Sequence, residues 1–274
     1  MRSQLRRTLY VGAGAIASAL GRPVRAPIFI VGSGRCGTTL LTDILGSHPE
    51  LLGYPGEAND LWHPRTYPFD ASGVADEPIE ADPAAFTRLS MAHWPRGHEK
   101  TIARAFSGYH LLKTPSRTLF VKSAMISFML DPIDRMFPDA RFVHLFRNGP
   151  SVVASYMEKN YGRYRRYNPP EDEYRNRVAR YWNDCLLEIG RAARELGLRD
   201  AGRFHEFSYE DVCDRPHAEL DRLADFLGLD PGGFAYDVSG IRSTNYKVGA
   251  WGDDPEWEEP LRLMEPAMRA HGYL

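Results

Sequence analysis

Three glycines, an arginine and two threonines follow one another closely in "IFIVGSGRCGTTLL", where an apolar run leads into a helical pattern. Gly32, Gly34 and Gly37 fit the G-x-G-x-x-G of a dinucleotide-binding turn. Gly32, Gly37, Thr38 and Thr39 also fit G-x-x-x-x-G-K-[ST], with threonine in place of the lysine. Both patterns predict an anion at the N-terminus of a helix that begins near Thr38, because backbone N–H groups and the helix dipole favour negative charge there.

The residues in and around the loop fit neither nucleotide pattern completely. A dinucleotide site needs an acidic residue about 20 positions further on, and Glu57 is suitably placed. However, a pyrophosphate turn generally presents bare glycine backbone, whereas this loop carries the Arg35 cation and two hydroxyls. A nucleoside triphosphatase needs the lysine and a strand-end aspartate for magnesium, and the sequence shows neither. The loop alone therefore predicts an anion site without naming the ligand.

A second oxyanion site is predicted in "FVHLFRNGPSVVASYMEKN". Arg147 lies where a buried strand ends, and Ser155 follows eight residues later on the next helix, one turn from Ser151 on the same face. Taken alone, Arg147 is more typical of an ordinary surface arginine, and Ser155 of a serine at the start of a helix. Together with the first loop, they predict a ligand that carries two separate phosphate groups.

These segments resemble the sulfotransferases that use 3′-phosphoadenylyl sulfate (PAPS). "GSGRCGTTLL" is similar to their 5′-phosphosulfate loop, and "FRNGPSVVASY" to their 3′-phosphate motif, R-[DN]-P-x-x-x-x-x-S. "LLKTPSRTL", "PDARFVHLFRN", "EFSYEDV" and "FLGL" follow in the family's usual order, so the resemblance covers roughly residues 27 to 274. The loop, with its arginine before C-G-T-T, is more similar to the tyrosylprotein and bacterial carbohydrate-type branch of the family than to the cytosolic phenol and steroid branch. Cys36 stands where serine is usual, and Gly149-Pro150-Ser151 replaces the common Pro-x-Asp.

The resemblance implies transfer of a sulfuryl group from PAPS to a hydroxyl acceptor, giving adenosine 3′,5′-bisphosphate. It places Arg35, Cys36, Gly37, Thr38 and Thr39 on the 5′-phosphosulfate, and Arg147 and Ser155 on the 3′-phosphate. Tyr209 would lie beside the adenine, and Ser243 and Lys247 would lie in a segment that closes over the nucleotide. Sulfuryl transfer needs cations and backbone donors on the leaving phosphate and a base for the hydroxyl, and no obligatory metal.

Three residues are predicted to act in catalysis. Glu57 is the expected base, because the family's tyrosylprotein branch has a glutamate at this spacing after its "HPE" segment. His63 is its rival, and pairing with an arginine such as Arg35 is the structural alternative for Glu57. Lys113 in "LLKTP" is expected to end a buried strand and stabilise charge at the bridging oxygen, together with Arg35.

Alternating strands and helices predict an α/β fold with a parallel β-sheet flanked by helices. The resemblance implies that this is a P-loop NTPase-like sulfotransferase fold with an irregular acceptor-side insert. Residues 27–274 are expected to form a single domain, with the insert at about 58–108. The binding crevice belongs at the carboxyl ends of the strands. Strands are expected in 26–31, 50–57, 109–115, 140–146 and from 203; helices are expected from 38, over 118–130, after 147, over 172–196, over 217–229 and at the C-terminus.

Composition sets further limits. The net charge of −2 over 274 residues gives no general attraction to nucleic acid. Three widely spaced cysteines argue against a disulfide framework, which favours a reducing compartment and a cytoplasmic location. Residues 1–26 combine arginines with an apolar run too short to span a bilayer. They are expected to form a helix or a flexible segment, with peripheral membrane contact as one role and export as a minority interpretation.

The acceptor is not specified by the sequence. Aromatic and histidine side chains in the insert suit a sugar-stacking or a flat apolar pocket equally well; they are Trp62, His63, Tyr67, Phe69, His93, Trp94 and His98. A small-molecule or glycan hydroxyl is expected. Two other functions stay open: a non-catalytic nucleotide-binding module and an NAD-type Rossmann oxidoreductase.

Overall fold

The computed structural model describes residues 2–62, 94–163, 169–238 and 254–274, together with Thr87, Ile241 and Trp251. The strands are β1 (Ile28–Val31), β2 (Leu51–Gly53), β3 (Thr118–Lys122), β4 (Arg141–Phe146) and β5 (Phe204–Ser208). The α-helices are α1 (Arg2–Ala19), α2 (Thr38–Gly46), α3 (Asn59–Trp62), α5 (His98–Lys113), α6 (Leu130–Met136), α7 (Gly149–Tyr156), α8 (Glu171–Glu195), α9 (Tyr209–Asp214), α10 (Pro216–Leu227) and α11 (Glu258–Ala270). Short 3₁₀ turns cover Ala124–Phe128, Pro231–Gly233 and Pro255–Trp257, and a π-helix covers Met157–Tyr161.

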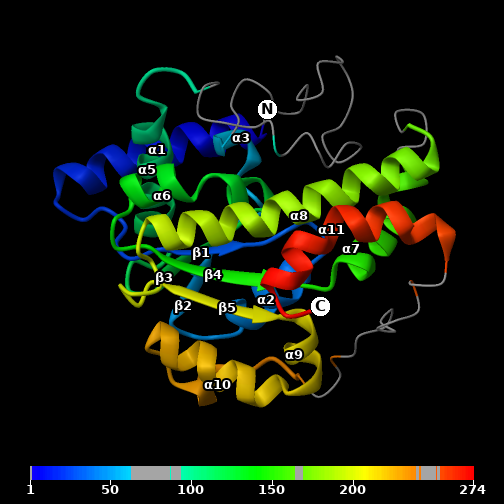
Figure 1. The fold of residues 1–274 in the computed structure, drawn as a ribbon. Coiled ribbons are helices and arrows are strands. Elements are labelled where there is room, and N and C mark those ends of the chain that lie inside the picture. The colour runs from blue at the N-terminus through cyan, green and yellow to red at the C-terminus, as the bar shows by residue number, and fades with distance from the viewer. Residues whose placement is uncertain are drawn as a thin grey trace.

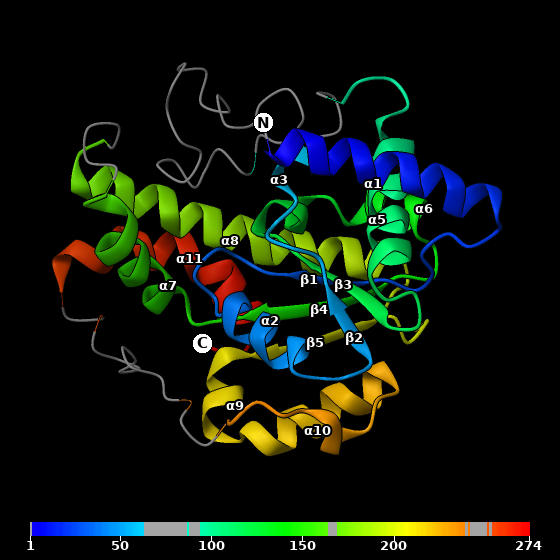
Figure 2. The same cartoon turned by 180° about the vertical axis from the view of Figure 1, so that it is seen from behind.

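The five strands form one parallel sheet in the order β2-β3-β1-β4-β5. The predicted fold class, a parallel sheet flanked by helices, is confirmed. Helices α1, α3, α5, α6, α8 and α11 lie over one face of the sheet, and α2, α9 and α10 lie over the other (Figures 1 and 2). All five carboxyl ends therefore meet at one edge of the sheet.

Alternation along the strands divides the interior into two apolar cores. Phe29 and Val31 of β1 pack with the α5, α6 and α8 side of the molecule. Ile28 and Ile30 face the opposite way and pack with α2 and α10. All four residues are at most 1% exposed, so β1 is anchored from both faces. The loop that follows β1 therefore leaves a rigid strand.

The structure corrects two element predictions. Residues 109–113 belong to helix α5 rather than a strand, because Ile102, Phe106 and Tyr109 recur at helical spacing and are buried together. Residues 118–122 form strand β3 rather than the start of a helix, since the central residues of "TLFVK" are buried between β2 and β1. The predicted irregular insert 58–108 consequently ends earlier, because its last residues are also helical.

Helix α1 packs across α5. A Cβ atom at Gly14 would lie 1.8 Å from the Arg104 carbonyl oxygen, and one at Gly108 would lie 1.8 Å from the Tyr10 carbonyl oxygen. Both positions therefore need glycine, because the two backbones touch there. Within the described residues, no helix is long and apolar enough to cross a membrane.

Candidate active site

The anion loop connects β1 to α2 and ends at the first turn of that helix. Gly37 caps α2 with a φ of 102° and makes no side-chain cap hydrogen bond. A Cβ atom at Gly37 would lie 2.5 Å from Cδ2 of Tyr209, so this position requires glycine for both its φ and its contact. The first-turn N–H groups of an uncapped helix are donors for an anion. Thr38 is buried and Thr39 exposed in that turn.

Buried side chains fix the loop from below. Ser127 Oγ accepts from the Gly32 N–H and donates to the Gly32 carbonyl, both at 2.9 Å. Tyr181 Oη accepts from the Gly34 N–H at 2.8 Å. Cys36 is fully buried, and burial raises the pKa of its thiol to about 12. The Cys36 side chain is therefore a packing group, and its N–H donates to the Ser33 carbonyl at 3.4 Å.

The second predicted anion site lies directly beside the loop. Arg35 Nε donates to Ser155 Oγ at 3.1 Å, and Arg147 Nη1 donates to the Arg35 carbonyl at 3.3 Å. The Arg147 guanidinium lies over the Tyr209 ring, 4.6 Å from its centroid, a cation–π contact. Arg147 is 9% exposed, and its Nε has no hydrogen-bond partner among the described residues. The structure thus brings Arg35, Arg147, Ser155 and Tyr209 together. Ser243 and Lys247 lie outside the described residues.

Glu57 follows β2 and forms an ion pair with Lys122, the last residue of β3, with Oε1 2.5 Å from Nζ. The Lys122 side chain is 16% exposed and that of Glu57 is 36% exposed. Lys122 is the register partner of Ile30, shortly before the anion loop. The partner of Glu57 is therefore Lys122 and not Arg35. Together, the ends of all five strands contribute to this edge.

Lys113 is not at the end of a strand, and its predicted place is wrong. It is exposed in the last turn of α5, before the amino end of β3. In a parallel sheet that is the edge opposite the anion loop, so Lys122 occupies the position expected of Lys113. The signal that sequence reasoning missed was "TLFVK", an apolar and aromatic run ending in lysine.

The predicted aromatic acceptor residues divide between packing and undescribed segments. Trp62 is fully buried, and its carbonyl accepts from Trp94 Nε1 at 2.6 Å. A His98 ring nitrogen lies 2.6 Å from the Leu61 carbonyl oxygen. Trp62 and His98 are therefore buried, and Trp94 packs against the core, so these three side chains have packing roles. His63, Tyr67, Phe69 and His93 lie outside the described residues.

The C-terminus contributes a contact that no motif indicated. Tyr273 Oη donates to Glu210 Oε2 at 2.8 Å, and Glu210 Oε1 accepts from the Asn148 N–H at 3.1 Å. Asn148 and Glu210 directly follow Arg147 and Tyr209 in the chain. Tyr273 therefore braces the two turns that carry the guanidinium and the ring of the second anion site.

Known proteins share this chain's sequence pattern and fold. A family model described as "Sulfotransferase family" matches residues 27–231. The nodulation protein NoeE of Sinorhizobium fredii is 26% identical over 253 residues, 84% of this chain and 56% of that protein. The omega-hydroxy-beta-dihydromenaquinone-9 sulfotransferase Stf3 of Mycobacterium tuberculosis is 25% identical over 252 residues, 74% of this chain. Because this chain covers only 63% of Stf3, it spans well under the full length of both relatives.

Solved structures share the fold. Sulfotransferase STF1 of Mycobacterium tuberculosis superposes with a TM-score of 0.59 at 16% identity, covering 98% of this chain and 82% of STF1. The sulfotransferase of Alicyclobacillus acidocaldarius gives 0.52 at 18% identity, covering 90% and 94% respectively. The family model spans most of the chain and includes the anion loop, Arg147, Ser155 and Tyr209. The chain therefore belongs to the sulfotransferase family.

Proposed function

We propose that this chain transfers a sulfuryl group from PAPS to a hydroxyl acceptor. The observation that carries the proposal is the junction of two anion sites through Arg35, which contacts Ser155 with its side chain and Arg147 with its carbonyl. PAPS carries a phosphosulfate at the 5′ position and a phosphate at the 3′ position of one ribose. Two neighbouring anion sites suit that ligand better than a nucleotide with one phosphorylated position.

The residues present fit this nucleotide. The uncapped N-terminus of α2 and the Thr38 and Thr39 hydroxyls would receive the 5′ group, with Arg35 beside them. The buried Arg147 Nε, which lacks a partner among the described residues, would donate to the 3′-phosphate. A buried guanidinium donor left without an acceptor is costly, which supports an anionic ligand there. Tyr209 would flank the adenine.

The proposed reaction is an in-line displacement at sulfur. A bond forms between the acceptor oxygen and sulfur while the bond from sulfur to the bridging oxygen of the departing nucleotide breaks. Glu57 would take the acceptor proton on Oε2, because Oε1 is held by Lys122. Lys122 and Arg35 would stabilise the charge that develops on the bridging oxygen. Lys122 thus takes the role that the sequence prediction gave to Lys113.

Protein cations and backbone donors supply the positive charge at the leaving group, so no metal is needed at the reacting atoms. Turnover is expected to persist in excess EDTA, measured as transfer of labelled sulfate from PAPS. Complete loss on chelation that magnesium restores would instead indicate a triphosphatase-like site.

We propose a hydroxyl on a lipid, glycan or other small metabolite as the acceptor. The name of Stf3 specifies a hydroxylated menaquinone, which supports this class. The test is incubation of the protein with labelled PAPS and a metabolite extract, followed by identification of the sulfated product. Nucleotide binding without transfer to any acceptor would favour the non-catalytic module.

The dinucleotide alternative loses support from the order of the strands. A Rossmann sheet places its second strand beside the first, where the acidic residue meets the ribose. Here β3 lies between β1 and β2, and Glu57 is paired with Lys122. NAD is therefore expected to give no thermal stabilisation.

Gly37→Ala is expected to abolish stabilisation by adenosine 3′,5′-bisphosphate and to lower the free energy of unfolding by about 1–3 kcal/mol. The new methyl group would meet Tyr209 and force a strained φ. Gly197→Ala is the control, because Gly197 has a φ of +61° with nothing within 4 Å of an added Cβ. Thermal shift assays should show lost nucleotide binding only for Gly37→Ala; retained binding would contradict the loop's role.

We propose that α1 also contacts an anionic membrane. Leu5, Leu9 and Ile16 are 58–66% exposed and are spaced to share one face of the helix, and Leu20, which directly follows the helix, is 61% exposed. Residues 1–26 contain five arginines and no acidic residue. An exposed apolar stripe with basic flanks is typical of a helix lying in the membrane interface.

Sedimentation with phosphatidylserine-containing vesicles tests this contact. Binding is expected to fall in Leu9→Glu/Ile16→Glu but not in Leu187→Glu, which alters an exposed leucine of α8. Equal binding of all three proteins, or equal binding to vesicles of phosphatidylcholine alone, would contradict the proposal.

We propose a cytoplasmic location because the cysteines form no disulfide bonds. Cys36, Cys185 and Cys213 are all free, and the first two are buried. Free thiols are typical of reducing compartments.

A further inference from the structure

Three side chains with metal-binding chemistry meet away from the anion loop. His144 on β4 and Glu206 on β5 are register partners, so they project side by side from the same face of the sheet. His271, just after α11, reaches the same place. One potential ligand atom from each residue lies within 4.8 Å of the other two. We propose that His144, Glu206 and His271 bind a zinc ion.

His271 and Glu206 each have a neighbour that orients the side chain toward the cluster. His271 Nδ1 lies 3.0 Å from the Ala267 carbonyl oxygen, which leaves Nε2 as the ligand atom. Ligating histidines commonly donate their other ring N–H to a backbone carbonyl in this way. Arg199 Nη2 donates to Glu206 Oε1 at 2.8 Å, so Oε2, which faces His144 Nδ1, is the oxygen that would bind the ion.

His144 is the buried member of the cluster. Its side chain is fully buried, and its Nδ1 lies 3.1 Å from Glu206 Oε2. That separation is close to the distance between two ligand atoms on one tetrahedral zinc ion. A shared ion would take the Nδ1 lone pair of a neutral His144 in place of the present contact with Glu206. The ring proton would then be on Nε2, which has no hydrogen-bond partner among the described residues.

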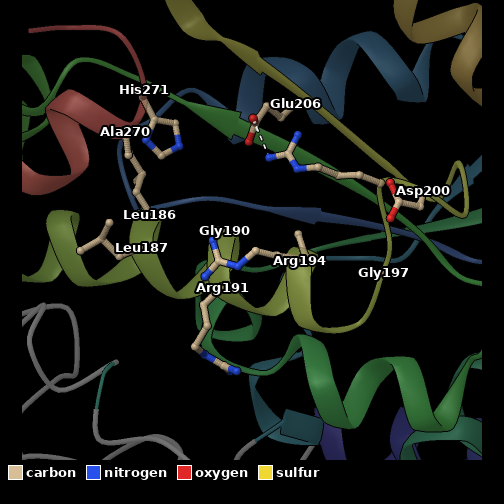
Figure 3. A pocket seen from close by; sticks show the side chains of 12 residues that line it. Leu186, Leu187, Gly190, Arg191, Arg194, Gly197, Asp200, Glu206, Ala270 and His271 are labelled. Atoms are coloured by element: carbon tan, nitrogen blue, oxygen red, sulfur yellow. Dashed lines mark hydrogen bonds and ion pairs between the residues drawn. The ribbon is translucent and has the colours of Figure 1, made fainter.

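The donor set selects the ion. Two imidazoles and one carboxylate suit zinc, whereas calcium and magnesium prefer oxygen ligands. Ligand atoms around tetrahedral zinc lie about 3.3 Å apart, so the side chains of Glu206 and His271 must close slightly around it. Both residues line a cavity of about 510 Å³, across from α8 (Figure 3). That cavity leaves room for a water molecule as the fourth ligand.

The ion would fasten the C-terminal helix to the sheet. His144 belongs to the interior strand β4 and Glu206 to the edge strand β5, while His271 follows a helix that lies beyond the segment matched by the family model. Two residues further on, Tyr273 braces Glu210 and, through it, Asn148 beside Arg147. Zinc would thus stabilise the C-terminal end of the chain next to the second anion site without touching the reacting atoms.

Metal binding to the full chain tests this inference independently of the sulfotransferase proposal. The protein is stripped with EDTA, dialysed, and titrated with ZnCl₂ by calorimetry, with Co²⁺ absorption reporting the coordination geometry. We expect one zinc per chain, a tetrahedral Co²⁺ spectrum and a rise in melting temperature. His271→Ala and Glu206→Gln should each weaken zinc binding at least about 100-fold and remove the thermal shift.

His217→Ala is the matched control, because His217 is exposed on α10 away from the cluster. It should bind zinc like the unaltered protein. Circular dichroism of the metal-free variants verifies that they are folded, and the conservative Glu206→Gln keeps the inference testable if His271→Ala loosens α11. Absence of zinc binding at micromolar concentration, or stoichiometric binding that both site variants retain, would overturn it.

Discussion

Glu57→Gln is expected to lower turnover by about 10²–10⁴-fold while the affinity for adenosine 3′,5′-bisphosphate stays unchanged. Glutamine keeps the size of the side chain but cannot take the acceptor proton. Glu57 is partly exposed at the sheet edge, and among the described residues only its Oε1 is held, by Lys122, so it can reach a hydroxyl without joining the nucleotide contacts. Single-turnover transfer from labelled PAPS measures the chemical step, and calorimetry measures nucleotide binding.

Two lysines provide a matched comparison for this prediction. Lys122→Ala should lower turnover by about 10²–10³-fold, because it removes a cation from the developing charge. Lys113→Ala should leave turnover near its original value, since Lys113 is exposed at the opposite edge of the sheet. Near-normal turnover in Glu57→Gln beside an inactive His63→Ala would transfer the role of base to the histidine.

Arg147→Ala is expected to weaken binding of adenosine 3′,5′-bisphosphate by about 1.5–3 kcal/mol, the value of a charged hydrogen bond. Binding of AMP should change little, because AMP lacks the 3′-phosphate. The prediction follows from the buried guanidinium, which lies over Tyr209 and has an unpartnered Nε among the described residues. Calorimetric titration of both nucleotides gives the preference as a ratio of dissociation constants.

Arg147→Lys refines the test, because lysine keeps the charge but loses the planar contact with the Tyr209 ring. Arg147→Lys should retain part of the preference for adenosine 3′,5′-bisphosphate over AMP. Arg141→Ala is the control at the other end of β4, where Arg141 donates to the Leu227 carbonyl. It should lower stability and leave the nucleotide ratio intact. Equal affinity of the unaltered protein for both nucleotides would contradict the two-phosphate site.

Local sequence patterns predicted correctly those parts of the protein that are contiguous in the chain. The anion loop, β1, β4, β5 and the long helix α8 each follow from a local pattern: an apolar β-branched run, a glycine-rich turn or a helical repeat. Arg147 was recognised for the same reason, because it directly follows the apolar strand "FVHLF".

The local sequence pattern predicted the wrong secondary structure between residues 109 and 130. "YHLL" has the length and apolar character of a strand, but Tyr109 continues the buried face of a helix that begins at His98. Burial between two other strands, rather than periodicity, makes "TLFVK" the strand β3. Because short apolar runs suit either structure, only their tertiary neighbours decide between them.

The contacts between residues that are distant in the chain follow from the assembled fold and not from any local pattern. The order of the strands places Lys122 beside Glu57 and joins Arg35 to Ser155 and Arg147. The packing of α11 against α8 brings His271 to His144 and Glu206. It also brings Tyr273 to Glu210. These pairs are far apart in the chain, and periodicity reports only how a segment buries its own face. The pairing of strand ends depends on how the whole sheet is assembled, which no single segment encodes.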